Sequence, residues 1–223
     1  MDQGWKVVMD FMSCLQFQAS TDAIYRGQPN WAWDIVPAVY RDKAAGIDDD
    51  AALQDWKQRA ARFANPLPQT EIEWLMLAQH HGLETSLLDW TSNPLVALFF
   101  ACDGEDEVDN SGGVWKSERQ HFTTANHSMF ISPFHEEKGA AYGNKPMLLN
   151  AVGRNNRSTA QDSIMSHHPF SDDFMLTADR IFDVKIEDKA PTLTALAQLG
   201  ISGDRLMVDI ARLVARMKAD RKG

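Results

Sequence analysis

The chain has 223 residues, of which 44% are hydrophobic, and a formal net charge of −9 at pH 7. This acidic balance excludes a broad nucleic-acid surface, because phosphate backbones are held mainly by clustered lysine and arginine. Two cysteines, Cys14 and Cys102, are too few for a disulfide framework or a thiolate zinc site. No apolar run approaches the roughly 20 residues that span a bilayer, and the acidic N-terminus does not resemble a secretory signal. We therefore expect a cytoplasmic protein that makes no membrane contact.

The first part of the chain predicts two helices and two extended segments. Apolar residues at helical spacing predict an amphipathic helix over residues 4–17. Residues 23–27 are β-prone and end at a Gly-Gln-Pro-Asn turn. Residues 31–40 alternate in part, which predicts a second extended segment broken by Pro37. Aspartates at 48–50 can cap a further helix, which the sequence Asn-Pro-Leu-Pro ends.

The next two helices carry clear start signals. Thr70 and Glu73 form a capping box, in which a hydroxyl and a carboxylate each satisfy a free backbone amide. Gln79 is expected on the apolar face of this helix, and Gly82 is expected to end it. Asn93 is a typical N-cap, and Pro94 follows it at the first helical position, where its missing N–H costs nothing. The apolar residues that come after predict a buried helix to about Cys102. Before this helix, the sequence LLDW predicts a short buried strand or turn.

The second half of the chain predicts strands followed by closing helices. The expected strands lie at 112–115, 128–132, 147–152 and 180–186, and the expected helices at 191–199 and 205–218. We therefore predict an α+β fold with small mixed or antiparallel sheets, flanking helices and a C-terminal helical segment. A single domain over residues 1–223 is expected, with a motif core at about 20–186 and C-terminal helices at about 189–220.

Polar side chains gather just before the helix that begins at Pro94. They are His80, His81, Thr85, Asp89, Thr91, Ser92 and Asn93. Some of these oxygens are expected to cap the helix, but there are more of them than one cap needs, and a helix N-terminus also attracts anions. Adjacent helical residues such as the two histidines point about 100° apart, so we predict no metal site.

Arg26 is the other candidate, and the residues alone leave two interpretations open. A guanidinium beside Gly27 could grip a phosphate or carboxylate, because the backbone there can approach a ligand closely. Alternatively, Arg26 is a turn arginine paired with a neighbouring acid.

Two motifs carry a family resemblance. Tyr25–Gln28 reads YRGQ, and Ala78–Ala101 reads AQHHGLETSLLDWTSNPLVALFFA. Together with Arg157 and Gln161, these motifs resemble the FRG domain, which is named for its (Phe/Tyr)-Arg-Gly signature. The resemblance covers most of the chain and implies that the Arg-Gly pair serves the family's site. The chain departs from the pattern at Glu84, Ser86 and Met165.

A more distant resemblance is to arginine-type ADP-ribosyltransferases. Many of them open with a Tyr-Arg-Gly strand, and their second element, Ser-Thr-Ser before a turn and an apolar helix, is similar in spacing to residues 89–94. Their third element is a glutamate, where this chain has Gln161, with Glu187 as a candidate outside the family position. The resemblance implies an ADP-ribosyltransferase-like fold and NAD as co-substrate.

The same resemblance implies roles for individual residues. The implied catalytic residues are Arg26, Asp89, Thr91 and Gln161. The implied NAD-binding residues are Tyr25, Arg26, Gly27, Gln28, His80, His81, Thr85, Trp90 and Asn93. Arg26 would hold the diphosphate or adenosine ribose, and Thr91 the nicotinamide-side ribose. Asp89 or a late glutamate would stabilise the oxocarbenium-like cation. We expect Arg26, His80, Asp89, Thr91 and Gln161 to line one pocket between two small sheets.

Three classes of function use such a pocket. The first is an ADP-ribosyltransferase-like enzyme that modifies a protein or nucleotide acceptor. The second is an NAD-cleaving or nucleotide-processing enzyme of a bacterial conflict or phage-defence system. The third is a non-catalytic module that binds a small ligand or a protein partner in the same cleft. Binding without turnover separates the module from both enzymes.

Overall fold

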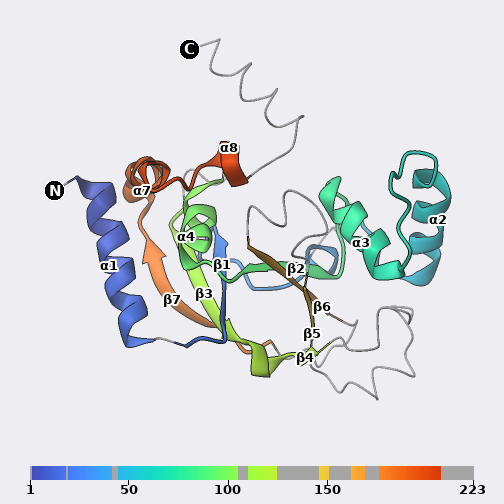
Figure 1. Ribbon diagram of the computed structural model, residues 1–223, viewed down its shortest axis with the longest axis horizontal. Coiled ribbons are helices and arrows are strands. Elements are labelled where there is room, and N and C mark those ends of the chain that lie inside the picture. Colours follow the sequence, from blue (N-terminus) through green and yellow to red (C-terminus); the bar gives the residue numbers. More distant parts are fainter. Residues whose placement is uncertain are drawn as a thin grey trace, which may run out of the picture.

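One sheet of seven strands forms the centre of the described fold, in the order β4-β5-β6-β2-β1-β3-β7 (Figure 1). Neighbouring strands are antiparallel except for the parallel pair of β4 and β5. The computed structural model describes residues 2–18, 20–41, 45–104, 110–124, 146–150, 162–168 and 176–206. The predicted α+β class is confirmed. The expectation of several small sheets was wrong, because β2 joins both halves of the strand set in one sheet.

The strands and helices of the described residues have the following bounds. The strands are β1 Ala23–Gln28, β2 Leu87–Thr91, β3 Gly112–Glu118, β4 Thr123–Thr124, β5 Met147–Asn150, β6 Ser163–His167 and β7 Asp179–Val184. The α-helices are α1 Gln3–Phe17, α2 Asp50–Ala60, α3 Glu71–His80, α4 Pro94–Cys102, α7 Ile186–Gln198 and α8 Gly203–Leu206. Two 3-10 turns lie at Ala38–Tyr40 and Arg119–His121. No helix among these described residues is long and apolar enough to cross a membrane.

Both signals predicted for α3 are confirmed. The Thr70 hydroxyl accepts from the Glu73 amide at 3.2 Å, and the Glu73 carboxylate accepts from the Thr70 amide at 3.3 Å. Gly82 ends the helix in the left-handed region at φ +87°. This tight start and stop fixes which residues lie in the last turn of α3, at the edge of the candidate site.

Three expected elements need correction, and one observed strand was missed. Residues 31–40 form turns and a 3-10 turn instead of a strand, and their amide at Trp31 donates to Ser111 O at 2.9 Å. The late strand ends at Val184, and α7 begins at Ile186, with Pro191 inside the helix instead of at its start. β6 was not predicted at all. The expected strand at 128–132 and most of the expected helix at 205–218 lie outside the described residues.

Strand alternation gives the sheet two distinct faces. Tyr25 on β1 lies directly opposite Thr91 on β2, so these side chains point to the same face. We call it the helix face, because Gly27, two residues along from Tyr25, lies against Ala97 of α4. Ile24, Arg26 and Trp90 alternate with these residues and point to the opposite side, which we call the Arg26 face.

Each face has its own hydrophobic packing. On the helix face, α4 covers β1 and β3 and packs with α1 and α7 around residues such as Phe11, Leu98 and Leu196. Further along the same face, α2 and α3 pack over β2 around Leu53, Leu75 and Leu87. Figure 1 shows these two groups of helices at opposite ends of the sheet. The Arg26 face packs around Ile24, Leu88, Trp90, Phe122 and Ile164.

The cap of α4 gives a first testable prediction. Asn93 Oδ1 accepts from the Leu95 amide at 3.1 Å, as expected, while Thr91 Oγ1 accepts from the amide of Asn93 itself at 3.0 Å. Replacing Asn93 by alanine leaves the Leu95 amide without this acceptor, so Asn93→Ala is expected to lower the free energy of unfolding by about 1 kcal/mol. Urea denaturation measures it, and an unchanged midpoint would show that another group caps the helix.

Candidate ligand-binding site

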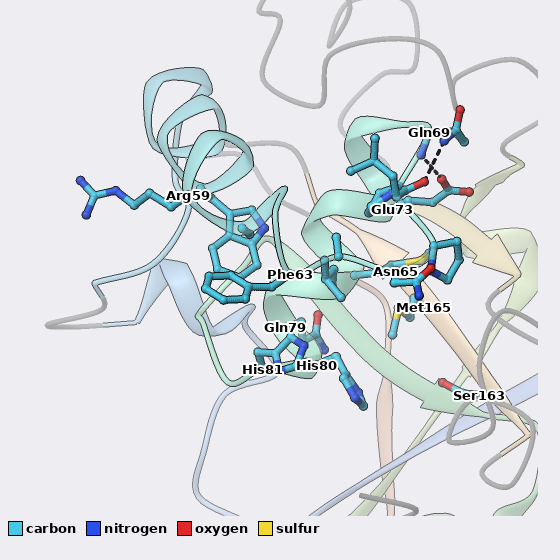
Figure 2. Close-up of a pocket in the computed structure, with 18 of the residues that line it drawn as sticks. Arg59, Phe63, Asn65, Gln69, Glu73, Gln79, His80, His81, Ser163 and Met165 are labelled. Carbon is cyan, nitrogen blue, oxygen red and sulfur yellow. Dashed lines mark hydrogen bonds between the residues drawn. The ribbon is translucent and has the colours of Figure 1, made fainter.

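A cavity of about 1060 Å³ lies on the helix face, between the α2–α3 pair and the strands β2 and β6 (Figure 2). Its volume is at the upper end of the range that small-molecule sites occupy. One group of polar side chains in its lining comes from the end of α3 and from the two strands: Gln79, His80, His81, Asp89 and Ser163. A second group comes from α2, the α2–α3 loop and the start of α3: Arg59, Asn65, Gln69 and Glu73. The apolar groups come mostly from α2, α3 and the loop between them: Trp56, Phe63, Leu67, Met76 and Met165.

Asp89 is held in place by a chain of hydrogen bonds. Gln79 Nε2 donates to Asp89 Oδ2 at 2.6 Å, and Thr85 Oγ1 donates to Gln79 Oε1 at 3.0 Å. Thr85 is buried, so it fixes which end of the Gln79 amide faces Asp89. The second carboxylate oxygen, Oδ1, accepts no hydrogen bond from the described residues. The cavity therefore contains one oriented acidic side chain with an acceptor to spare.

The two histidines at the end of α3 both line the cavity. The ring centroids of His80 and His81 are 5.2 Å apart, and their planes are nearly perpendicular at 77°. Figure 2 shows both rings beside Gln79 at the same side of the cavity. No group of three histidine, cysteine or acidic side chains within the described part of the chain could hold a metal ion. The pair thus contributes ring surface and nitrogen atoms to the wall.

Arg26 lies on the other face of the sheet and contacts the backbone of β2, the strand that carries Asp89. Its Nη1 donates to the backbone carbonyl of Asp89 at 2.7 Å, and its Nε donates to Gln28 Oε1 at 3.4 Å. Burial lowers the pKa of Arg26 to about 10; nearby Asp89 opposes this effect and Arg41 adds to it. The expectation that Arg26 grips a ligand in the cavity was wrong, because the sheet separates its side chain from the lining.

The rest of the YRGQ motif also makes contacts within the fold. Tyr25 is buried in the core under α4. A Cβ at Gly27 would lie 1.9 Å from the carbonyl oxygen of Ala97, so only glycine lets α4 approach β1 this closely. Gln28 is buried and donates from Nε2 to Trp33 O at 3.0 Å. All four signature residues therefore position β1 against its neighbours.

The residues around Asp89 in the second motif likewise make contacts within the fold. Thr91 is buried and accepts from the Asn93 amide, and Asn93 caps α4. Trp90 donates from Nε1 to Ser166 Oγ at 2.8 Å on the Arg26 face, where Ser166 Oγ is 2.6 Å from His168 Nε2. These contacts are structural, and none of Thr91, Trp90 and Asn93 lines the cavity.

The expected convergence of five residues in one pocket was therefore wrong. His80 and Asp89 share the cavity, but Arg26 and Thr91 point to opposite faces of the sheet, because Thr91 pairs with Tyr25 and not with Arg26. The pocket also lies between helices and one sheet, not between two sheets. Gln161, the expected third element, lies outside the described residues.

Several cavity residues were not predicted from the sequence. Gln79 was assigned to the apolar face of α3, and Ser163 and Met165 lie on β6, which was not predicted. A signal for Gln79 was present, because an amide on the apolar face of a helix needs a polar partner in the interior. For the α2–α3 loop residues such as Phe63 and Leu67, nothing in the local sequence indicated a cavity wall.

The comparisons with known proteins identify one family. Residues 21–110, which include β1, α2, α3, β2 and α4, match the sequence model of the FRG domain. No curated protein and no solved structure gives a significant match. The matched stretch holds both the YRGQ motif and most of the cavity lining. The part of the chain that matches the FRG domain is therefore residues 21–110, and the candidate ligand site lies largely within it.

Proposed function

We propose that the cavity beside α3 binds NAD or a closely related nucleotide, and that the protein is an ADP-ribosyltransferase-like or NAD-cleaving enzyme. The observation that carries this proposal is the Asp89 carboxylate, which Gln79 orients inside a cavity of about 1060 Å³. The aromatic side chains of Trp56 and Phe63 in the opposite wall offer surface for a base or a nicotinamide ring. Such a mixture of apolar wall and few polar groups is typical of small-molecule sites.

Asp89 has the chemistry that cleavage of NAD requires. The bond from ribose C1′ to the nicotinamide nitrogen breaks, its electron pair leaves with nicotinamide, and C1′ gains oxocarbenium character. A fixed carboxylate beside C1′ stabilises the positive charge as it moves from the nicotinamide ring onto the ribose. A hydroxyl or amine of the acceptor, or water in a hydrolase, then forms the new bond to C1′ and releases its proton to solvent. Asp89 is therefore the proposed catalytic residue.

In this proposal Arg26 has a different role from the one that the family resemblance implies. It holds the backbone of β2 at Asp89 and is a positioning residue. Within the described lining, the arginine at the cavity is Arg59, which is largely exposed and pairs with Asp55 at 2.8 Å. A diphosphate would therefore lie toward Arg59 at the α2 side, with the nicotinamide ring toward Asp89.

The proposal is tested by calorimetry with NAD and by an assay of nicotinamide release. Wild-type protein is expected to bind NAD and release nicotinamide, and Asp89→Asn is expected to slow release by roughly 100-fold through loss of charge stabilisation. Asp10→Asn is the matched control, because Asp10 is an exposed carboxylate on α1 outside the cavity. Equal release by wild type and Asp89→Asn would exclude Asp89 as the catalytic group, and no NAD binding would exclude the ligand.

A second candidate, the non-catalytic module, is favoured by one observation. Every residue of the YRGQ motif makes contacts that position β1 and none of them lines the cavity, so the motif supplies no catalytic group there. NAD binding without release of nicotinamide and without labelled acceptors in a cell lysate would identify the module. A labelled macromolecule would instead separate the transferase from a hydrolase.

A further inference from the structure

The cavity contains a carboxylate oxygen, Asp89 Oδ1, that accepts no hydrogen bond from the described residues. We propose that Asp89 Oδ1 receives the cationic or N–H-donating end of the ligand, so that the site prefers a positively charged ring to its neutral counterpart. For NAD this end is the nicotinamide ring, which is cationic only in the oxidised form. The inference rests on the proposed function only in taking this cavity as the ligand site.

Asp89 is the right carboxylate for this contact because its partners leave one oxygen available. Oδ2 accepts from Gln79, whose own carbonyl oxygen is occupied by Thr85. The Gln79 amide is thus already oriented and presents its donor to Asp89. Oδ1 has no partner among the described residues and can only accept, since an ionised carboxylate carries no proton to donate. The complementary ligand group is a cation or a hydrogen-bond donor.

Glu73, the other acidic residue of the lining, is already used within the protein. Its Oε2 accepts from the amides of Gln69 at 2.7 Å and Thr70 at 3.3 Å, where it caps α3 (Figure 2). Glu73 lies in the first turn of α3, whereas Gln79 lies in the last. The rise between them is roughly 9 Å along the helix. The two carboxylates therefore mark separate ends of the cavity.

The wall contains groups that suit a planar cation. Trp56 is held by its Nε1, which donates to Trp74 O at 3.2 Å, so its ring orientation is fixed. Phe63 already accepts a cation on its ring, since the Arg62 guanidinium carbon lies 4.5 Å from the ring centroid. Aromatic faces attract positive charge through their quadrupole. A cationic ring would thus find both a carboxylate and aromatic surface in this cavity.

The test uses two fragments that differ mainly in charge, 1-methylnicotinamide and nicotinamide. Ligand-observed NMR titration of wild-type protein is expected to show about tenfold tighter binding of the cation, as one charge-assisted contact provides. Asp89→Asn is expected to remove this preference. Glu73→Gln is the matched control: it changes the net charge equally, keeps an amide oxygen for the cap, and is expected to leave the preference unchanged.

The outcomes separate this inference from the proposed function. Equal binding of both fragments to wild type, no binding of either, or equal loss of preference in both variants would overturn the inference. NAD binding, measured by calorimetry, tests the proposed function separately from these fragment titrations. A cation preference that depends on Asp89, in a protein that does not bind NAD, would support the inference and reject NAD as the ligand.

Discussion

Gly27→Ala is expected to produce a large loss of stability. The added Cβ would lie 1.9 Å from the Ala97 carbonyl oxygen and 2.6 Å from the Ala101 amide nitrogen. Both atoms belong to the backbone of α4, which is buried between β1 and α7 and cannot yield as a flexible side chain does. Moving the helix would disrupt the largest core of the protein, so we expect a loss of about 3 kcal/mol or more. Urea denaturation of purified protein measures it.

Gly82→Ala is the matched control for this substitution. A Cβ at Gly82 meets no atom within 4 Å, but the residue has φ +87°. Only the cost of placing alanine in the left-handed region remains, which is about 1–2 kcal/mol. A loss at Gly27 no larger than that at Gly82 would contradict the close contact of α4 with β1.

Acid pH is expected to destabilise the protein through two buried histidines. Burial lowers the pKa of His167 to about 4, and burial, His167 and Arg26 together lower the pKa of His168 well below its ordinary value. Because the folded-state pKa lies below the unfolded value of about 6.5, the fold favours the neutral ring. Stability is full above that unfolded value and is lost as the pH falls toward 4. For His167 alone, the loss between about pH 7.5 and pH 5 is about 2 kcal/mol.

His167→Leu separates this effect from acid titration of carboxylates. His167 lies on β6 opposite Leu87 and Met147, and its Nε2 has no hydrogen-bond partner in the described structure, so leucine replaces it without leaving a polar partner unsatisfied. Unfolding free energies of both proteins are measured across this pH range. The variant is expected to lose about 2 kcal/mol less than wild type. Parallel pH profiles would show that His167 does not titrate with unfolding.

The sequence predicted best the elements whose signals are local. The capping box of α3, the Asn93 cap with Pro94, and the stop at Gly82 each depend on side chains within a few residues, and all three are confirmed. The sequence also predicted β1 and β2, because their apolar residues form short continuous runs. These elements hold most of the FRG match, so the motif region was the most predictable part of the chain.

β6 was missed because its pattern is set by distant partners. The sequence SIMSHH contains four polar residues that are buried, and their burial depends on Trp90, Leu87 and the rest of the sheet. Without that pairing, the segment resembles a polar loop. The prediction of a strand at residues 31–40 was wrong for the opposite reason. Their partial alternation suggested a strand, but the Pro37 region instead wraps over the Arg26 face, where Tyr40 donates to His168 O at 2.8 Å.

The site was predicted in part, since Asp89, His80 and His81 do line the cavity. The role of Arg26 could not be derived from sequence, because it depends on a register of one residue. With Tyr25 opposite Thr91, Arg26 points away from the helices; a shift of one residue would have placed it among them. A motif shows which residues the fold depends on, but not which face of the sheet each side chain occupies.

The strand order also has a consequence for how the protein folds. The α2–α3 wall of the cavity forms from residues close in sequence, whereas its floor needs β2 to pair with β6. Trp90 and Ser166, which meet across this pair, are 76 positions apart. Closing such long loops costs chain entropy before any contact repays it, which slows folding. The floor beneath Asp89 therefore exists only after two strands far apart in the sequence have paired. A compact intermediate with α2 and α3 already packed would still lack a binding site.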